Sequence, residues 1–380
     1  MLANNKESRN NTKRKRINAI GLSVLLIVVL FFLFIFNFQH FLKEEILSTI
    51  KLTIPENMIA ASVDTDEPQS ALLPYDIDQS SYSSHEYTWI YKWSSYSWTI
   101  LIPSALSDYF YNQSRPQTDN YAIYVIHPFQ KEALELICEQ FQIICSNKNF
   151  NEEETIKFLS SFVRSTEYIS DIKDGESYEY PKYPIETLCD NGGDCEDKSI
   201  LLASLLNIFN VKVALIGLHY DDIGHMIVGV AGDSLSGQYY VEDNGDKYYA
   251  LDATNRGWGI GGIDPKYRDA TLKLLRITST PIILYDFYGS FVDYSLQLTV
   301  NIENVGTADA HNYHILAGFD ASNNQLWNSE ETPIFDLPVG REMELILTLR
   351  PPYGKHTRIC VFVYDGEKIV DRKYSDWFDL

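Results

Sequence analysis

A glycine pair followed by a cysteine and a long apolar run is the feature that most constrains this chain. Residues 192–198 read Gly-Gly-Asp-Cys-Glu-Asp-Lys and lead directly into the apolar run 199–206. Asp194 suits the N-cap of a helix, and Asp197, three residues later, suits the reciprocal position of a capping box. We therefore expect a helix that starts at Cys195 and buries its apolar side chains.

A cysteine in the first turn of a helix lies beside unpaired backbone N–H groups and the positive end of the helix dipole. Both favour the thiolate, which is the nucleophilic form of Cys195. The same N–H groups can stabilise an oxyanion. The alternative is a buried structural cysteine, because a cysteine without a base is not a catalytic site.

A base and a carboxylate follow downstream. His225 opens the expected strand 226–230, and Asp252 comes directly after the expected strand 248–251. Such an order can place an imidazole against the Cys195 thiol and a carboxylate behind the imidazole. His219, at the end of the preceding strand, is the rival base, although a histidine before a polar turn is usually solvated.

The residues around these positions match a known pattern. They read Tyr-Pro-Ile-Glu-Thr-Leu at 183–188, Gly-Asp-Cys-Glu-Asp at 193–197, Gly-His-Met at 224–226 and Leu-Asp-Ala-Thr at 251–254. The chain thereby resembles the transglutaminase-like cysteine peptidase superfamily, and in particular its membrane-anchored archaeal members. The aromatic residue that follows the catalytic histidine in many members is absent here.

The resemblance implies a Cys-His-Asp triad made of Cys195, His225 and Asp252. It also implies an α+β, papain- or transglutaminase-like core over residues 86–285, in which the cysteine-bearing helix packs on an antiparallel sheet. We expect hydrolysis of a peptide or isopeptide bond without a metal or organic cofactor. Two alternatives stay open: acyl transfer to an amine, which cross-links proteins, and a surface binding or adhesion module without activity.

Patterns along the rest of this region agree with a mixed fold. Helical periodicity covers 128–141 and 152–164, and alternating strands are expected at 87–91 and 97–101. Asn244-Gly245 is a strong hairpin signal between two further strands. The glycine-rich loop 256–265 lacks the strand–GxGxxG–helix setting of a phosphate cradle. Its Trp258 either lines the cleft or packs on the surface.

The pattern of apolar residues changes at about residue 286. Alternating apolar residues at 296–302, 313–319, 343–349 and 359–363 are separated by turns. Short alternating strands with regular turns predict a β-sandwich for 286–380. This segment resembles immunoglobulin-like modules of prokaryotic surface proteins, and we expect a spacer without a ligand.

The N-terminus carries a membrane signal. Residues 1–16 form a basic tail, and the uncharged apolar segment 17–38 is long enough to span a bilayer as a helix. A cleavable signal peptide would have a shorter core and a small-residue cleavage site. The basic side stays in the cytoplasm, so we expect a single-pass anchor, a stalk over 39–85 and extracytoplasmic domains.

The net charge and the cysteines limit the classes of partner and of site that this chain can have. The net charge is −21, and no basic patch interleaved with aromatics occurs, which argues against nucleic-acid binding. Five cysteines leave four besides Cys195. If one helix continues through both Cys138 and Cys145, the two lie too far apart for a disulfide, and the sequence leaves the disulfide state open. A third interpretation is a metal site whose ligands are His219, Asp221, Asp222, His225 and Cys195. The mixture of ligand types and the lack of CxxC or HExxH spacing argue against it.

Overall fold

The structure of the protein is a computed structural model that describes residues 62–63, 70–72 and 82–380 with short gaps. The gaps are Trp93, Ser114, Gln117, Asp119, 174–175, Tyr178, 221–222, 236–239 and 323–324. The chain divides into two compact units at residue 53, and every described residue belongs to the second.

The expected basic tail, the membrane segment 17–38 and most of the stalk therefore lie outside the described residues. Within the part of the chain that the structure describes, no helix is both long and apolar enough to span a membrane.

The described fold is mixed α+β and rich in antiparallel strands. The helices are α2 (Ser104–Asn112), α3 (Ala122–Val125), α4 (Pro128–Asn147), α5 (Glu152–Ser165), α6 (Pro184–Cys189), α7 (Cys195–Ile208) and the 3-10 turn η2 (Pro265–Tyr267). The strands before residue 280 are β1 (Ser62–Val63), β2 (Ser70–Leu72), β3 (Tyr82–Tyr91), β4 (Ser94–Pro103), β5 (Glu167–Tyr168), β6 (Ile172–Lys173), β7 (Glu176–Ser177), β8 (Gly192–Gly193), β9 (Lys212–Tyr220), β10 (Ile223–Ala231), β11 (Val241–Asp243), β12 (Asp246–Leu251) and β13 (Thr271–Arg276).

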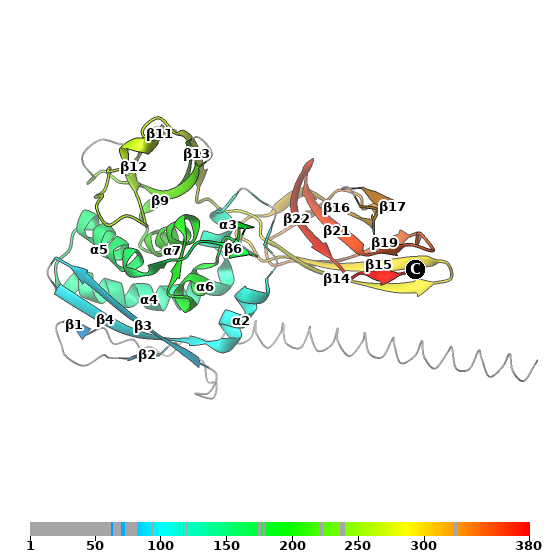
Figure 1. The fold of residues 1–380 in the computed structure, drawn as a ribbon, viewed down its shortest axis with the longest axis horizontal. Helices are drawn as coiled ribbons and strands as arrows, with labels where there is room; N and C mark the ends of the chain where they lie inside the picture. Colours follow the sequence, from blue (N-terminus) through cyan, green and yellow to red (C-terminus); the bar gives the residue numbers. More distant parts are fainter. Residues whose placement is uncertain are drawn as a thin grey trace, which may run out of the picture. The chain divides into compact units, whose positions relative to one another are not determined.

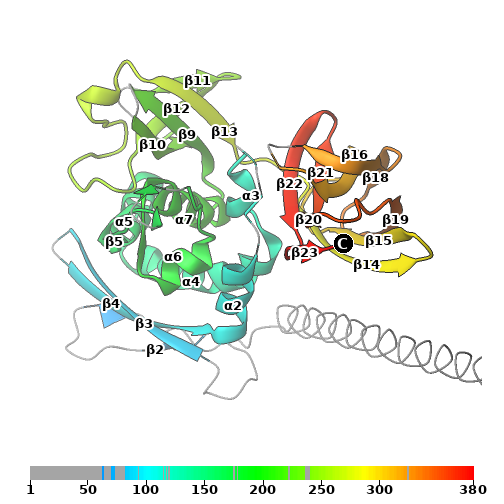
Figure 2. The ribbon, with the colours of Figure 1, turned by 45° about the vertical axis from the view of Figure 1, so that its right-hand side comes forward.

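The helices form a layer between two sets of strands (Figure 1). A five-stranded antiparallel sheet, in the order β11-β12-β10-β9-β13, covers α7 on one side. The long β3–β4 hairpin packs on α5 on the other side, as the turned view also shows (Figure 2). Burial from both sides explains why α7 is apolar almost all round, from Ile200 to Leu206.

Aromatic side chains fill the space between the hairpin and the helices. Trp89 and Trp98 from the hairpin meet edge to face, and both rings lie against Phe141 of α4 and Phe162 of α5. A capping box starts α5, with the Asn151 side chain accepting the N–H of Glu154 at 2.9 Å. Helix α4 runs six residues further than the pattern indicated.

The register of the central sheet determines where the site lies. Asn244 and Gly245 both have positive φ, so the predicted tight turn joins β11 to β12. Val228 of β10 pairs with Leu251 of β12. The residue that follows β12, Asp252, therefore comes beside the start of β10, where His225 lies. All five cysteines are free, and the extension of α4 beyond the expected end at 141 places Cys138 and Cys145 on one helix.

Two further antiparallel sheets follow from residue 283. One has the order β14-β15-β19, and the other has the order β17-β16-β21-β22 with β18 beside β16. Their strands are β14 (Ile283–Val292), β15 (Ser295–Asn304), β16 (Ala310–Asp320), β17 (Leu326–Glu331), β18 (Phe335–Leu337), β19 (Glu342–Leu349), β21 (Ile359–Asp365) and β22 (Lys368–Tyr374), with the short pair β20 (His356–Thr357) and β23 (Phe378–Asp379) beside them.

Both sheets contribute to one apolar core. Leu298 and Val300 from β15 pack in the same buried cluster as Ile315 and Phe319 from β16 and Val361 from β21. This is the packing of a β-sandwich. Strand β14 begins three residues before the expected boundary of 286, because its first residues pair with the end of β15. The immunoglobulin-like assignment stays a prediction.

We expect residues 278–380 to fold as an independent unit, because the buried cluster of the sandwich is built entirely from residues of this segment. The isolated fragment should unfold cooperatively in urea, and Leu298→Ala should lower the free energy of unfolding by about 2–5 kcal/mol. Circular dichroism and intrinsic fluorescence should give coincident transitions. A gradual, non-cooperative loss of signal would contradict the domain boundary.

Candidate active site

The chain just before α7 packs so closely against its neighbours that only glycine fits at positions 192 and 193. Strand β8 (Gly192–Gly193) runs parallel to β5. A Cβ on Gly193 would lie 2.4 Å from the Cβ of Asp197, and a Cβ on Gly192 would lie 2.8 Å from the carbonyl oxygen of Glu167. The glycine pair therefore lets the chain turn tightly into the helix that begins at Cys195.

The carboxylate of Asp197 fixes the first turn of α7. It accepts the backbone N–H of Asp194 at 3.3 Å, which is the capping-box contact expected from the sequence. Its other oxygen accepts the backbone N–H of Lys182 at 2.7 Å. The Lys182 ammonium in turn pairs with Asp190 at 2.8 Å and lies 3.8 Å from Asp197. The helix start is thus tied to segment 180–183.

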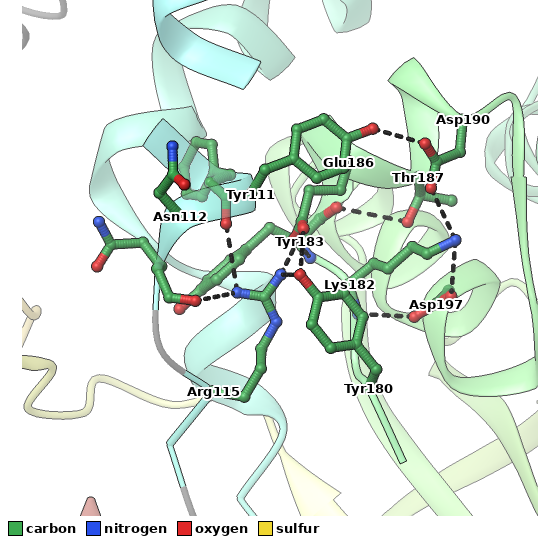
Figure 3. A network of polar contacts seen from close by, with 12 residues as sticks. Tyr111, Asn112, Arg115, Tyr180, Lys182, Tyr183, Glu186, Thr187, Asp190 and Asp197 are labelled. Carbon is green, nitrogen blue, oxygen red and sulfur yellow. Dashed lines mark hydrogen bonds and ion pairs between the residues drawn. The ribbon is translucent and has the colours of Figure 1, made fainter. Parts of the chain in front are cut away.

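A buried ion pair holds that segment in turn (Figure 3). The fully buried carboxylate of Glu186 pairs with the Arg115 guanidinium, and it accepts the Tyr183 N–H at 2.8 Å and the Tyr180 hydroxyl at 3.1 Å. The guanidinium also lies 4.2 Å from the centre of the Tyr180 ring. Glu186 is the glutamate of the Tyr-Pro-x-Glu-Thr-Leu segment, so this motif holds the segment that contacts the start of α7.

His225 and Asp252 are joined by a hydrogen bond. The Nε2 atom of His225 lies 3.1 Å from Oδ2 of Asp252, and the imidazole stacks on the Tyr267 ring at 4.9 Å. Oδ1 of Asp252 accepts the N–H and the hydroxyl of Thr254 at 2.8 and 2.7 Å, and the N–H of Asn255 at 3.2 Å. Nδ1 is therefore the ring atom left for a proton from a thiol.

The charge state of Asp252 follows from these contacts. Burial alone would raise its pKa, but the hydrogen bonds and charge of His225 and the hydrogen bonds from Thr254 outweigh burial and lower the pKa to about 2. The carboxylate is ionised at neutral pH and can only accept, so Nε2 of His225 carries the proton.

Cys195 and His225 line the same cleft, which has a volume of about 550 Å³. Cys195 enters it from the start of α7 and His225 from β10. His219 also lines it, from β9, but the described hydrogen bond to Asp252 comes from His225. The other lining residues are Tyr168, Ser170, Asp171, Glu179, Asp194, Glu196, Gly217, Leu218, Gly224, Met226, Thr271, Leu272 and Lys273. Trp258 is not among them; it packs on Gly262 of its own loop.

The thiol is held in its protonated form, which differs from the expectation of a stabilised thiolate. Sγ of Cys195 donates to the Glu196 carboxyl at 3.1 Å. Burial raises the pKa of the Cys195 thiol well above its usual range, and the charge and hydrogen bond of Glu196 raise it further. Burial and a neighbouring carboxyl thus outweigh the helix N-terminus.

Glu196 itself holds a proton at neutral pH. Burial, together with the hydrogen bond and charge of Asp194, raises its pKa to about 9. The carboxyl therefore becomes negative only above about pH 9, and its charge then opposes ionisation of the Cys195 thiol. At neutral pH burial keeps the resting Cys195 neutral.

The described residues offer one set of ligand atoms that could hold a metal ion. These atoms belong to Asp194, Cys195 and Glu196, and they lie within 4.8 Å of one another. They are not the set considered from the sequence, of which Asp221 and Asp222 lie outside the described residues.

Comparison with known proteins gives weak similarities only. Neither a protein-family model nor a curated protein sequence matches this chain. EGTA-treated Legionella pneumophila LapG matches with a TM-score of 0.27 and 17% identity, covering 50% of this chain and 82% of LapG. The calcium-bound form of LapG matches with a TM-score of 0.24 and 19% identity, covering 42% of this chain and 86% of that chain.

Other solved structures match smaller shares of the chain. The CARDB domain of the PF1109 protein from Pyrococcus furiosus, in complex with di-metal ions, has a TM-score of 0.19 and 17% identity, covering 24% of this chain and 76% of that chain. Beta-glucosidase 3B from Thermotoga neapolitana has a TM-score of 0.18 and 16% identity, covering 27% of this chain and only 17% of its own. At these TM-scores the assignment of the site rests on the geometry described above.

We expect Glu196→Gln to lower the pKa of the Cys195 thiol, because the variant removes a carboxyl that becomes negative as the thiol ionises. The rate of alkylation by iodoacetamide at pH 10, where the Glu196 carboxyl of the wild type is ionised, should rise at least tenfold, which corresponds to about one pKa unit. The pH–rate profile of alkylation gives the midpoint directly. Glu167→Gln, an exposed glutamate on β5, is the matched control. An unchanged midpoint in Glu196→Gln would contradict the electrostatic account.

Proposed function

We propose that the chain is a transglutaminase-like cysteine peptidase that hydrolyses peptide or isopeptide bonds through Cys195, His225 and Asp252. The observation that carries the proposal is the hydrogen bond between His225 and an ionised Asp252, beside a cleft that Cys195 enters from a helix N-terminus. A nucleophile, a base and a group that orients the base are the parts that acyl chemistry needs.

The proposed reaction proceeds in two stages. The Cys195 sulfur attacks the substrate carbonyl carbon while Nδ1 of His225 takes the thiol proton, and a tetrahedral oxyanion forms. The C–N bond then breaks, and the imidazolium returns the proton to the leaving amine. Water, deprotonated by His225, attacks the thioester, and the acid leaves as Cys195 regains its proton. Asp252 accepts the hydrogen bond from Nε2–H of His225 and stabilises the imidazolium throughout.

The neutral resting thiol favours one of two forms of this mechanism. A pre-formed thiolate–imidazolium pair requires a thiol pKa near or below that of histidine, whereas here burial and Glu196 raise it. His225 must therefore remove the proton as the sulfur attacks, in the manner of a serine triad. The hydrogen bond from Sγ to Glu196 must break in this step, so rotation of the Cys195 side chain precedes catalysis.

The same raised thiol pKa favours one competing function, a binding module that keeps the residues of a site without turnover. Acyl transfer to an amine would use the same thioester and differs only in the second nucleophile. For the cellular setting we propose a single-pass anchor at 17–38 that presents the site outside the cell, where peptide or isopeptide substrates would be cleaved.

We expect Cys195→Ala and His225→Ala each to abolish turnover and the double variant to lose nothing more, because the two residues act as a unit. Asp252→Ala should retain more activity, since its role is orientation and charge support. The protein would be profiled on peptide, isopeptide and glutamine–amine substrates, with products identified by mass spectrometry.

His219→Ala is the control variant for the assignment of the base, because His219 lines the same cleft without the described bond to Asp252. It should retain most of the activity. If His219→Ala lost turnover while His225→Ala stayed active, the base would be His219 and not His225. Turnover that survives in Cys195→Ala would exclude the thiol mechanism, and no turnover in the wild type on any substrate would favour the binding module.

A further inference from the structure

Acyl chemistry at Cys195 needs two hydrogen-bond donors for the oxyanion, and so far the site supplies one. The backbone N–H of Cys195 belongs to the first turn of α7, where N–H groups have no acceptor within the helix. A second donor must point into the cleft from an element adjacent to the start of α7.

Strand β5 lies in the required place. It runs parallel to β8, with Tyr168 opposite Gly193, and the N–H of Ile169 donates to the carbonyl oxygen of Gly193 at 3.1 Å. The turned view shows this short strand beside α7 (Figure 2). Tyr168 is therefore held next to a residue only two positions before Cys195, and its side chain lines the cleft.

The phenol of Tyr168 is ready to donate. Its side chain is 56% exposed, and within the described part of the chain its hydroxyl has no hydrogen-bond partner. Burial, and then the charges of Cys195 and Asp194, raise its pKa to about 12, so the hydroxyl keeps its proton at any pH at which the enzyme would work. Tyr168 and Cys195 line the same cleft.

The other donors of the cleft are less well placed. His219, Thr271 and Lys273 come from β9 and β13, which do not pair with the residues just before Cys195 as β5 does. The N–H of Met226 hydrogen-bonds to the sulfur of Cys195 itself. Ser170 follows Tyr168 on the same extended segment and lines the cleft too, but its hydroxyl has a much shorter reach.

We propose that the Tyr168 hydroxyl is the second oxyanion donor and hence a catalytic residue of this site. It donates to the developing oxyanion together with the Cys195 N–H. The inference rests on the proposed acyl chemistry at Cys195, so its test has to separate the two claims.

The test compares two reactions of the same thiol. With p-nitrophenyl acetate the sulfur forms a bond to the carbonyl carbon, p-nitrophenolate leaves with its electron pair, and His225 takes the thiol proton, so an oxyanion forms on the way. Iodoacetamide alkylates the same sulfur by displacement of iodide, without an oxyanion. The burst of p-nitrophenol gives the acylation rate, and loss of the free thiol gives the alkylation rate.

Tyr168→Phe should lower the acylation rate by about 10²–10³-fold, the usual effect of removing one such donor. It should change the alkylation rate less than about twofold, because the donor serves only the oxyanion. Tyr220→Phe, an exposed tyrosine at the end of β9, should leave both rates unchanged, and Ser170→Ala, the other hydroxyl of the segment, should keep more acylation than Tyr168→Phe.

Three outcomes would overturn the inference. Equal acylation by the wild type and Tyr168→Phe would show that the phenol is not a donor. Equal losses in both reactions would show that it acts on the thiol. A loss in Ser170→Ala alone would assign the role to serine. If wild-type protein alkylates at Cys195 but gives no burst, the proposed function fails before the role of Tyr168 is reached.

Discussion

The rest of the site depends on the contacts that hold the first turn of α7 against the side chain of Asp197. Asp197 accepts the N–H groups of Asp194 and Lys182, and the absent side chain of Gly193 leaves room for it. The Arg115–Glu186 ion pair then fixes the segment that contains Lys182. Through this chain of contacts, the position of the Cys195 thiol is set by groups that take no part in the chemistry.

Electrostatics divides the site into two halves with opposite behaviour. Hydrogen bonds from His225 and Thr254 overcome burial and keep Asp252 ionised, with its pKa lowered to about 2. Around the nucleophile, burial prevails, so that Cys195 stays a thiol and Glu196 stays protonated. In the proposed mechanism the carboxylate of Asp252 is thus ready before the Cys195 thiol is, and the barrier to attack includes the release of the thiol from Glu196.

The sequence predicted those parts of the fold that local rules determine. The helix start at Cys195 followed from the capping pair, and the β11–β12 turn followed from Asn244-Gly245. The approach of Asp252 to His225 was anticipated because both lie at strand ends. Strand β5 was not predicted, since two residues carry no periodicity. The effect of Glu196 was missed because its burial arises from tertiary packing.

The central claim is that Cys195 is the nucleophile and His225 the group that takes its proton. The most direct measurement is peptide mapping by mass spectrometry after brief reaction with p-nitrophenyl acetate and quenching in acid. The account predicts an acetyl group on the peptide that contains Cys195 in the wild type, and its loss in His225→Ala. Acetylation of Cys195 that is equally fast in His225→Ala, or found only at other residues, would contradict the account.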